Sequence, residues 1–179
     1  MNREDLPMLN QDIIYFDNGA TTLKPKCVID KIVEYYEEYT ANAHRGDYKN
    51  SIKVDMEYEG ARNIVQDFIN AKHREEIIFT SGATEGLNMI ANGFFWNLLE
   101  KDDEILITKA EHASNVMPWF RLANDLDAKI KYIDLDDNYY VTLDNVKKSI
   151  TPKTKVISLA QITNVIGDVR PIKEICEYA

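Results

Sequence analysis

Two kinds of segment alternate along the amino-acid sequence. Short runs rich in β-branched residues are typical of strands, and longer runs with apolar residues at helical spacing are typical of amphipathic helices. The short runs predict five strands, over Asp12–Phe16, Glu76–Thr80, Glu104–Thr108, Lys129–Ile133 and Lys155–Ala160.

The longer runs predict the helices that connect these strands. Apolar residues share one helix face in the stretch after Pro25 and again in Ser51–Asn70. Strand–helix alternation of this kind implies an α/β fold, with a mostly parallel sheet and helices on both of its faces. Further helices are predicted over Thr84–Leu99, Pro118–Asp127, Leu143–Ser149 and Pro171–Tyr178.

The predicted elements form one continuous domain after a short N-terminal arm, residues 1–16, because no repeat, low-complexity tract or Pro/Gly-rich linker interrupts them. The last predicted helix resembles a crossover helix, but no parallel strand follows it. We therefore interpret Ala179 as a truncation point within a larger domain that begins at residue 17.

The charge balance narrows the class of partner. The chain carries 21 Lys and Arg against 30 Asp and Glu, and this net charge of −9 argues against nucleic acid and against an anionic membrane surface. The first ten residues contain no apolar run, so they do not predict a signal peptide. The most apolar stretch, Met89–Leu99, is shorter than the roughly 20 residues that a membrane span needs.

The two cysteines and three histidines form no pattern. Cys27 and Cys176 are far apart, and His44, His73 and His112 show no metal-ligand spacing. The sequence therefore predicts neither a disulfide framework nor a metal site, and it favours a soluble protein in a reducing cytoplasm.

Three polar segments follow predicted strands, where ligands bind in α/β sheets. In the first, Thr80–Asn88, a turn of small residues precedes a helix that is expected to begin near Thr84. The unpaired N–H groups of such a helix start can bind an anion, and the Thr84 hydroxyl can add a donor. The same pattern equally fits Thr84 as a simple N-cap.

The second and third segments each contain one polar residue of interest. His112, in Thr108–Trp119, could stack on a ligand ring or carry a proton, although a lone loop histidine is more often a surface residue. Asn164, in Ala160–Ile172, could donate to and accept from a ligand, although the local pattern favours a turn-forming asparagine. Two further glycine-containing loops, YFDNGATTLKP and NAHRGDY, fit ordinary turns when taken alone.

The order and spacing of these five segments are together specific. YFDNGATTLKP, NAHRGDY, TSGATEGLN, EHASNVMPW and QITNVIG resemble the opening turn, HRG loop, phosphate loop, histidine loop and asparagine loop of group II (SUF-type) cysteine desulfurases. Those enzymes belong to the class V aminotransferases of fold type I, which use pyridoxal 5'-phosphate (PLP). The resemblance implies that residues 17–179 are part of the large domain of such an enzyme.

The resemblance also implies roles for individual residues. The backbone amides at Ala83 and Thr84, with the Thr84 hydroxyl, would hold the cofactor phosphate. His112 would stack on the pyridine ring and assist proton transfer. Asn164 would bind near the cofactor's phenolic oxygen and the substrate carboxylate.

The implied reaction converts L-cysteine to L-alanine and an enzyme-bound persulfide, which supplies sulfur for iron–sulfur clusters. Ala20 and His44 would line the substrate pocket. An amino-acid substrate, a sulfur-acceptor protein and a homodimer are the partners that the resemblance implies.

The sequence departs from the family pattern in three ways. Many relatives have a second hydroxyl residue in place of Ala83, and many carry another histidine after the HRG loop, which leaves the substrate open among cysteine, selenocysteine and related amino acids. The Ser-x-His-Lys segment, whose lysine binds PLP covalently, has no counterpart, and neither Cys27 nor Cys176 occupies the nucleophile's place. We therefore expect a chain that cannot attach PLP through a matching lysine and is inactive alone.

Other readings of the sequence stay open. The chain fits a non-catalytic remnant or dimerisation module, or another class V enzyme such as a selenocysteine lyase or an aminotransferase. A doubly wound nucleotide-binding domain is less favoured, because the DNGATT turn does not supply a G-x-G-x-x-G pattern.

Overall fold

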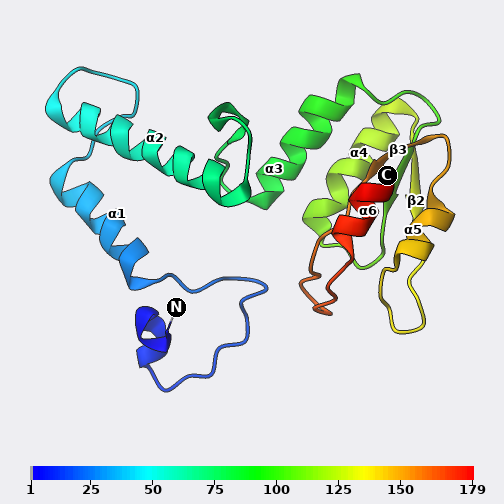
Figure 1. The fold of residues 1–179 in the computed structure, drawn as a ribbon, viewed down its shortest axis with the longest axis horizontal. Coiled ribbons are helices and arrows are strands. Elements are labelled where there is room, and N and C mark those ends of the chain that lie inside the picture. Colours follow the sequence, from blue (N-terminus) through cyan, green and yellow to red (C-terminus); the bar gives the residue numbers. More distant parts are fainter. Residues whose placement is uncertain (1) are drawn as a thin grey trace. The chain divides into compact units, whose positions relative to one another are not determined.

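The computed structural model describes residues 2–179, which divide into two compact units, one up to Phe79 and one spanning Thr80–Ala179. The first unit contains two long helices, α1 (Lys26–Glu38) and α2 (Lys49–Ile69) (Figure 1). Both confirm the helices predicted from apolar spacing. Short 3-10 turns cover Arg3–Asp5, Pro7–Asn10 and Arg74–Glu76.

The second unit is built on a three-stranded parallel sheet in the order β2-β1-β3. Its strands are β1 (Glu104–Ile107), β2 (Lys129–Tyr132) and β3 (Thr154–Ile157), which confirm three of the five predicted strands. In the central strand, Ile105 lies opposite Ile130 on one side and Val156 on the other.

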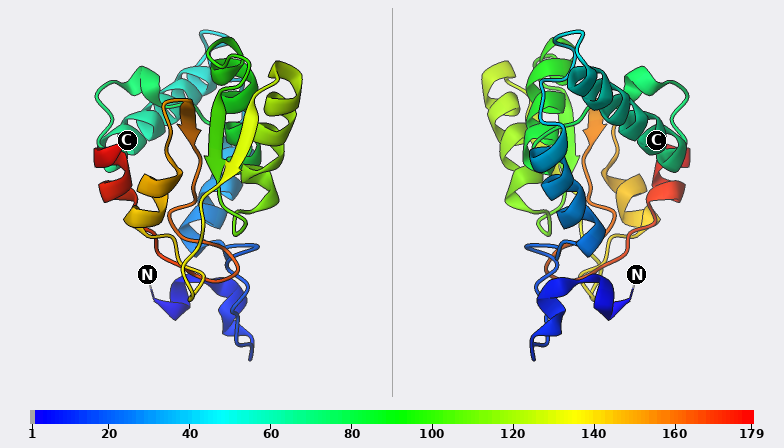
Figure 2. Two further views of the ribbon diagram at one scale, coloured as in Figure 1. Left: turned by 90° about the vertical axis from the view of Figure 1, so that its right-hand side faces the viewer. Right: turned by 90° about the vertical axis from the view of Figure 1, so that its left-hand side faces the viewer.

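Helices cover both faces of this sheet, as the strand–helix alternation predicts (Figure 2). The side chains of β1 point alternately to the two faces. Ile105 packs against Trp119 and Leu122 of α4 (Met117–Leu126), in one cluster of buried residues. Leu106 packs in a second cluster with residues of α5 (Leu143–Ser149) and α6 (Ile172–Tyr178).

The helix that opens the second unit is less regular than the sequence predicts. Instead of one helix over Thr84–Leu99, α3 covers Ala83–Met89 and continues as a π turn over Ile90–Phe94 and a 3-10 turn over Phe95–Asn97. The Asn92 side chain donates to the carbonyl oxygen of Asn88 at 2.9 Å within this distorted stretch. Side-chain hydrogen bonds to the preceding turn are a common accompaniment of bent helices.

Two predicted strands are wrong. Asp12–Phe16 and Glu76–Thr80 pair with no strand within residues 2–179, and neither is assigned as sheet. The N–H of Ile77 instead donates to Arg74, closing a 3-10 turn. An extended run becomes a strand only when a neighbouring strand takes its backbone hydrogen bonds, and the described chain offers none at these two places.

The strand order creates a switch point at β1. The connection from β1 to β2 passes through α4 on one face, and the connection from β2 to β3 passes through α5 on the other. Ligand sites of doubly wound sheets lie at such a point, beyond the carboxyl ends of the two diverging strands. None of the helices within residues 2–179 has the length and hydrophobicity that crossing a membrane requires.

Candidate functional site

His112 lies in the loop that leaves the carboxyl end of β1. It is the N-cap of a 3-10 turn over Ala113–Asn115, and its Nδ1 accepts the backbone N–H of Ser114 at 3.1 Å. A backbone N–H can only donate, so Nδ1 acts as the acceptor. This geometry assigns the imidazole proton to Nε2, and the ring is exposed, so that N–H is available to a ligand.

Thr84 lies on the first turn of α3. The N-cap of this helix is Gly82, so the structure does not support the alternative in which Thr84 itself is the cap. Within residues 2–179, the backbone N–H groups of Ala83 and Thr84 donate no hydrogen bond, whereas the N–H of Ser81 is taken by the Glu85 carboxylate at 2.6 Å. That hydrogen bond holds the pKa of Glu85 below its ordinary value.

The Ser114 hydroxyl links Thr84 to His112. Its Oγ lies 2.8 Å from the Thr84 hydroxyl and 3.0 Å from His112 Nδ1. The start of α3 and the histidine loop are therefore in direct contact, although 30 residues separate Thr84 from Ser114. The sequence does not single out Ser114 as a site residue, because a local pattern does not predict a contact over this separation.

Asn164 lies in the loop that leaves β3, beside the histidine loop. The loop turns where Gly167, with φ +75°, donates its N–H to Thr163 at 3.1 Å. Asn164 is exposed on this turn and lines the same cleft as His112 and Lys109. The cleft, of about 560 Å³, falls within the range of about 300–1,000 Å³ that small-molecule sites occupy.

Thr84 opens onto an adjoining hollow, which it shares with Asn88, Ser114 and Arg121. Ala113 borders both hollows. The sequence predicts Thr84, His112 and Asn164 in one cleft because each follows a predicted strand. For Thr84 that reason is wrong, since Glu76–Thr80 is not a strand, and the contact with Ser114 is what brings α3 to the site.

Ala20 and His44 belong to the first unit, and their placement in a substrate pocket stays a prediction. Ala20 ends a turn in which its N–H donates to Asp17 at 3.1 Å. His44, at φ +59°, has Nε2 3.3 Å from a Glu59 carboxylate oxygen and Nδ1 3.7 Å from Asp55.

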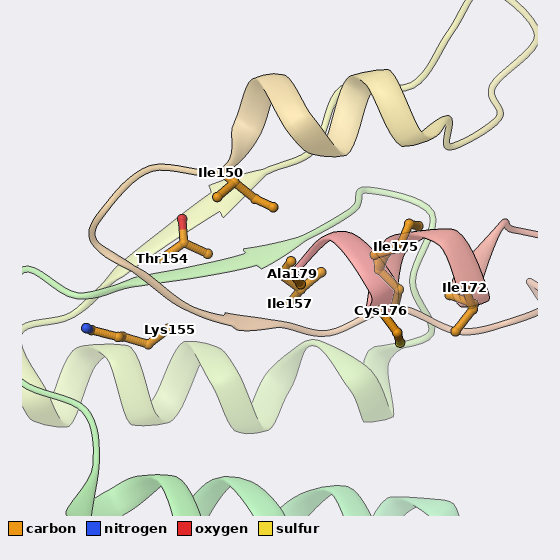
Figure 3. Close-up of a pocket in the computed structure, with 9 residues that line it drawn as sticks. Ile150, Thr154, Lys155, Ile157, Ile172, Ile175, Cys176 and Ala179 are labelled. Atoms are coloured by element: carbon orange, nitrogen blue, oxygen red, sulfur yellow. The ribbon is translucent and has the colours of Figure 1, made fainter.

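A separate groove of the second unit lies between β3 and α6 (Figure 3). Ile157, Ile172 and Ile175 make it largely apolar, and Cys176 is exposed beside it. In the part of the chain that the structure describes, no group of three His, Cys, Asp or Glu side chains could hold a metal ion. Of the residues discussed, His112 and Asn164 lie in the loops that follow β1 and β3.

Comparisons with known proteins identify the family to which the chain belongs. Residues 14–179 match the class-V aminotransferase family, so the chain belongs to that family. It is 44% identical to a probable cysteine desulfurase of Borreliella burgdorferi, over 99% of this chain and 43% of the relative.

Solved structures agree with this assignment. A cysteine desulfurase from Thermococcus onnurineus NA1, solved in its apo form, superimposes with a TM-score of 0.90 at 39% identity, over 98% of this chain and 43% of that one. SspA, solved in complex with cysteine, gives a TM-score of 0.81 at 25% identity, over 92% of this chain and 47% of that one. The chain thus spans less than half the length of the proteins it matches.

Proposed function

We propose that this chain supplies the cofactor-binding part of a PLP-dependent cysteine desulfurase of the SUF type. The observation that carries the proposal is the hydrogen-bonded series Thr84–Ser114–His112, which joins a helix start to an exposed imidazole beside the cleft. Family membership and the similarity to cysteine desulfurases support it.

The residues present fit PLP. A phosphate needs several donors, and the free amides of Ala83 and Thr84 supply two at a helix N-terminus. The exposed Thr84 hydroxyl, which contacts Ser114, lies beside them and can add a third. A pyridine ring needs a flat partner, and His112 offers one within reach of the same donors. When bound, PLP acts as an electron sink for the amino acid's reacting carbon.

Each residue of this chain then has one task. Ala83 and Thr84 bind and orient the phosphate. His112 packs on the cofactor ring, and its Nε2–H can donate a hydrogen bond at the substrate side. The doubly protonated ring could give up a proton there and later receive it again. Asn164 offers one donor and one acceptor to the cofactor's phenolic oxygen and the substrate carboxylate.

We further propose that L-cysteine is the substrate, as for the desulfurases this chain resembles and in keeping with the cysteine bound to SspA. Residues 1–16 would be an N-terminal arm and residues 17–179 part of the large domain. The lysine that binds PLP covalently has no counterpart in these 179 residues, so the chain alone would bind the cofactor reversibly and would not turn over. A homodimer and a sulfur-acceptor protein would complete the enzyme.

The test is the replacement His112→Ala in the longest open reading frame that contains this chain. General acid–base groups contribute on the order of 10²–10⁴-fold to rate, so alanine and persulfide formation from cysteine should slow by that factor. His73→Ala, a histidine outside every motif, is the matched control and should leave turnover unchanged. An unaltered rate in His112→Ala would contradict the proposal.

A further inference from the structure

A buried polar cluster lies beneath the loops that carry His112 and Asn164. Its centre is an ion pair between Arg170 and Glu111, whose side chains are both 0% exposed. A second carboxylate, Asp168, lies 3.4 Å from Arg170 Nε and is 5% exposed. Buried charges are costly unless they are paired and fully hydrogen-bonded.

Glu111 meets that condition by binding both sides of the site. Its Oε1 accepts from Arg170 and, at 3.1 Å, from the hydroxyl of Thr108 at the end of β1. Its Oε2 accepts from the Asn115 side chain at 2.8 Å and from the N–H of Ala160 at 3.0 Å. Glu111 and Asn115 stand on either side of His112 in the sequence, so one carboxylate fixes both ends of the histidine loop.

Arg170 holds the other loop. Its N–H donates to Gln161 at 2.9 Å, which closes the base of the loop containing Asn164. Its guanidinium donates to the carbonyl oxygen of Ala160 and to the Thr108 hydroxyl, each at 3.2 Å. The planar fork of an arginine suits such a set of fixed acceptors.

We propose that Glu111 and Arg170 are positioning residues, which set His112 against Asn164 by locking the two loops together. Neither reaches the cleft with its charged group, since both side chains are fully buried. The consequence for catalysis rests on the proposed function, whereas the consequence for loop order does not. Small displacements of catalytic groups lower the reaction rate, by about 10²-fold for a displacement of about 1 Å.

The variant Glu111→Gln tests whether Glu111 and Arg170 hold the two loops together, and it leaves no unpaired charge. The amide has the same shape, and Arg170 keeps Asp168 as its ionic partner. Asp168→Asn is the matched control, because it makes the same chemical change on the same arginine but within one loop. Arg170→Met would leave two buried carboxylates unpaired and is expected to fold poorly, so it does not carry the test.

The first readout is hydrogen exchange at the Ser114 amide, which donates to His112 Nδ1. In the 179-residue chain, Glu111→Gln should speed this exchange about tenfold, while β1 amides stay protected. An amide –NH2 cannot accept, so the hydrogen bonds to one of the two Glu111 oxygens are lost. Asp168→Asn should change it less than about twofold. Equal effects of the two variants, or loss of protection in β1 as well, would overturn the proposal.

The second readout is the kinetics of the PLP-loaded protein expressed from the longest open reading frame that contains this chain. Glu111→Gln should lower kcat about tenfold with KM little changed, and Asp168→Asn should leave both near the original values. A change confined to KM, with kcat unaltered, would overturn a positioning role. If the unmodified protein shows no desulfurase activity, the proposed function fails, and Ser114 exchange still decides whether the pair locks the loops.

Discussion

Ser114 determines how Thr84 and His112 can work together. Ser114 Oγ lies within hydrogen-bond distance of both side chains, and a hydroxyl can donate one hydrogen bond while it accepts another. Because His112 Nδ1 already accepts the Ser114 N–H, a phosphate bound at Thr84 could redirect the hydroxyl without disturbing the ring. The contact thus ties phosphate binding to the histidine while leaving Nε2 free.

The free amide of Ala83 can be removed without breaking the helix, because proline is tolerated at the first helical position. Ala83→Pro should weaken PLP binding about tenfold or more, the loss expected for a hydrogen bond to a charged group. Fluorescence titration with PLP measures this. Ala83→Ser, which keeps the amide and adds a hydroxyl, should bind at least as well as the unmodified chain, and equal affinities for the proline and serine variants would contradict the assignment.

The Glu85 carboxylate should make the start of α3 sensitive to acid. Its hydrogen bond with Ser81 lowers its pKa below 4.5, so the stabilisation is complete above 4.5 and is lost only as pH falls through the lowered value. An NMR titration should show the Ser81 amide shift with a midpoint below pH 4.5. The step should vanish in Glu85→Gln, and a midpoint at or above 4.5 would contradict the hydrogen bond.

At the scale of elements, α4 stabilises the sheet through its buried face. Leu122 is 0% exposed and packs with Ile105 and Ile107. Leu122→Ala should lower the free energy of unfolding by about 2–5 kcal/mol. Asn124→Ala, an exposed position on the same helix, should change it by less than about 0.5 kcal/mol. Urea denaturation followed by tryptophan fluorescence reports on the second unit, because it holds both tryptophans. Equal losses would show that Leu122 is not a core residue.

The sequence predicts well those elements whose own apolar pattern reflects their burial. The buried run Glu104–Thr108 is recognisable because its apolar residues face helices on both sides. Asp12–Phe16 and Glu76–Thr80 are similarly apolar, but strand pairing depends on distant residues that composition does not specify. The π turn over Ile90–Phe94 carries no distinctive local signal either.

At the scale of the whole molecule, the α/β fold and the family follow from sequence, while the way the site is assembled does not. The motifs around Thr84, His112 and Asn164 can each be recognised in the sequence. Their arrangement depends on contacts between distant residues, such as Thr84 with Ser114 and Glu111 with Arg170, which are 30 and 59 residues apart. The spacing of residues along the sequence does not predict those contacts.

The central claim is that this chain binds the phosphate and ring of PLP through α3 and the histidine loop. An NMR titration of the labelled 179-residue chain with PLP tests it most directly. The amides of Ala83 and Thr84 and the ring of His112 should shift together and saturate, and inorganic phosphate should compete at Ala83 and Thr84 without perturbing the ring as PLP does. Shifts confined to surface lysines, or none at these three residues, would contradict the claim.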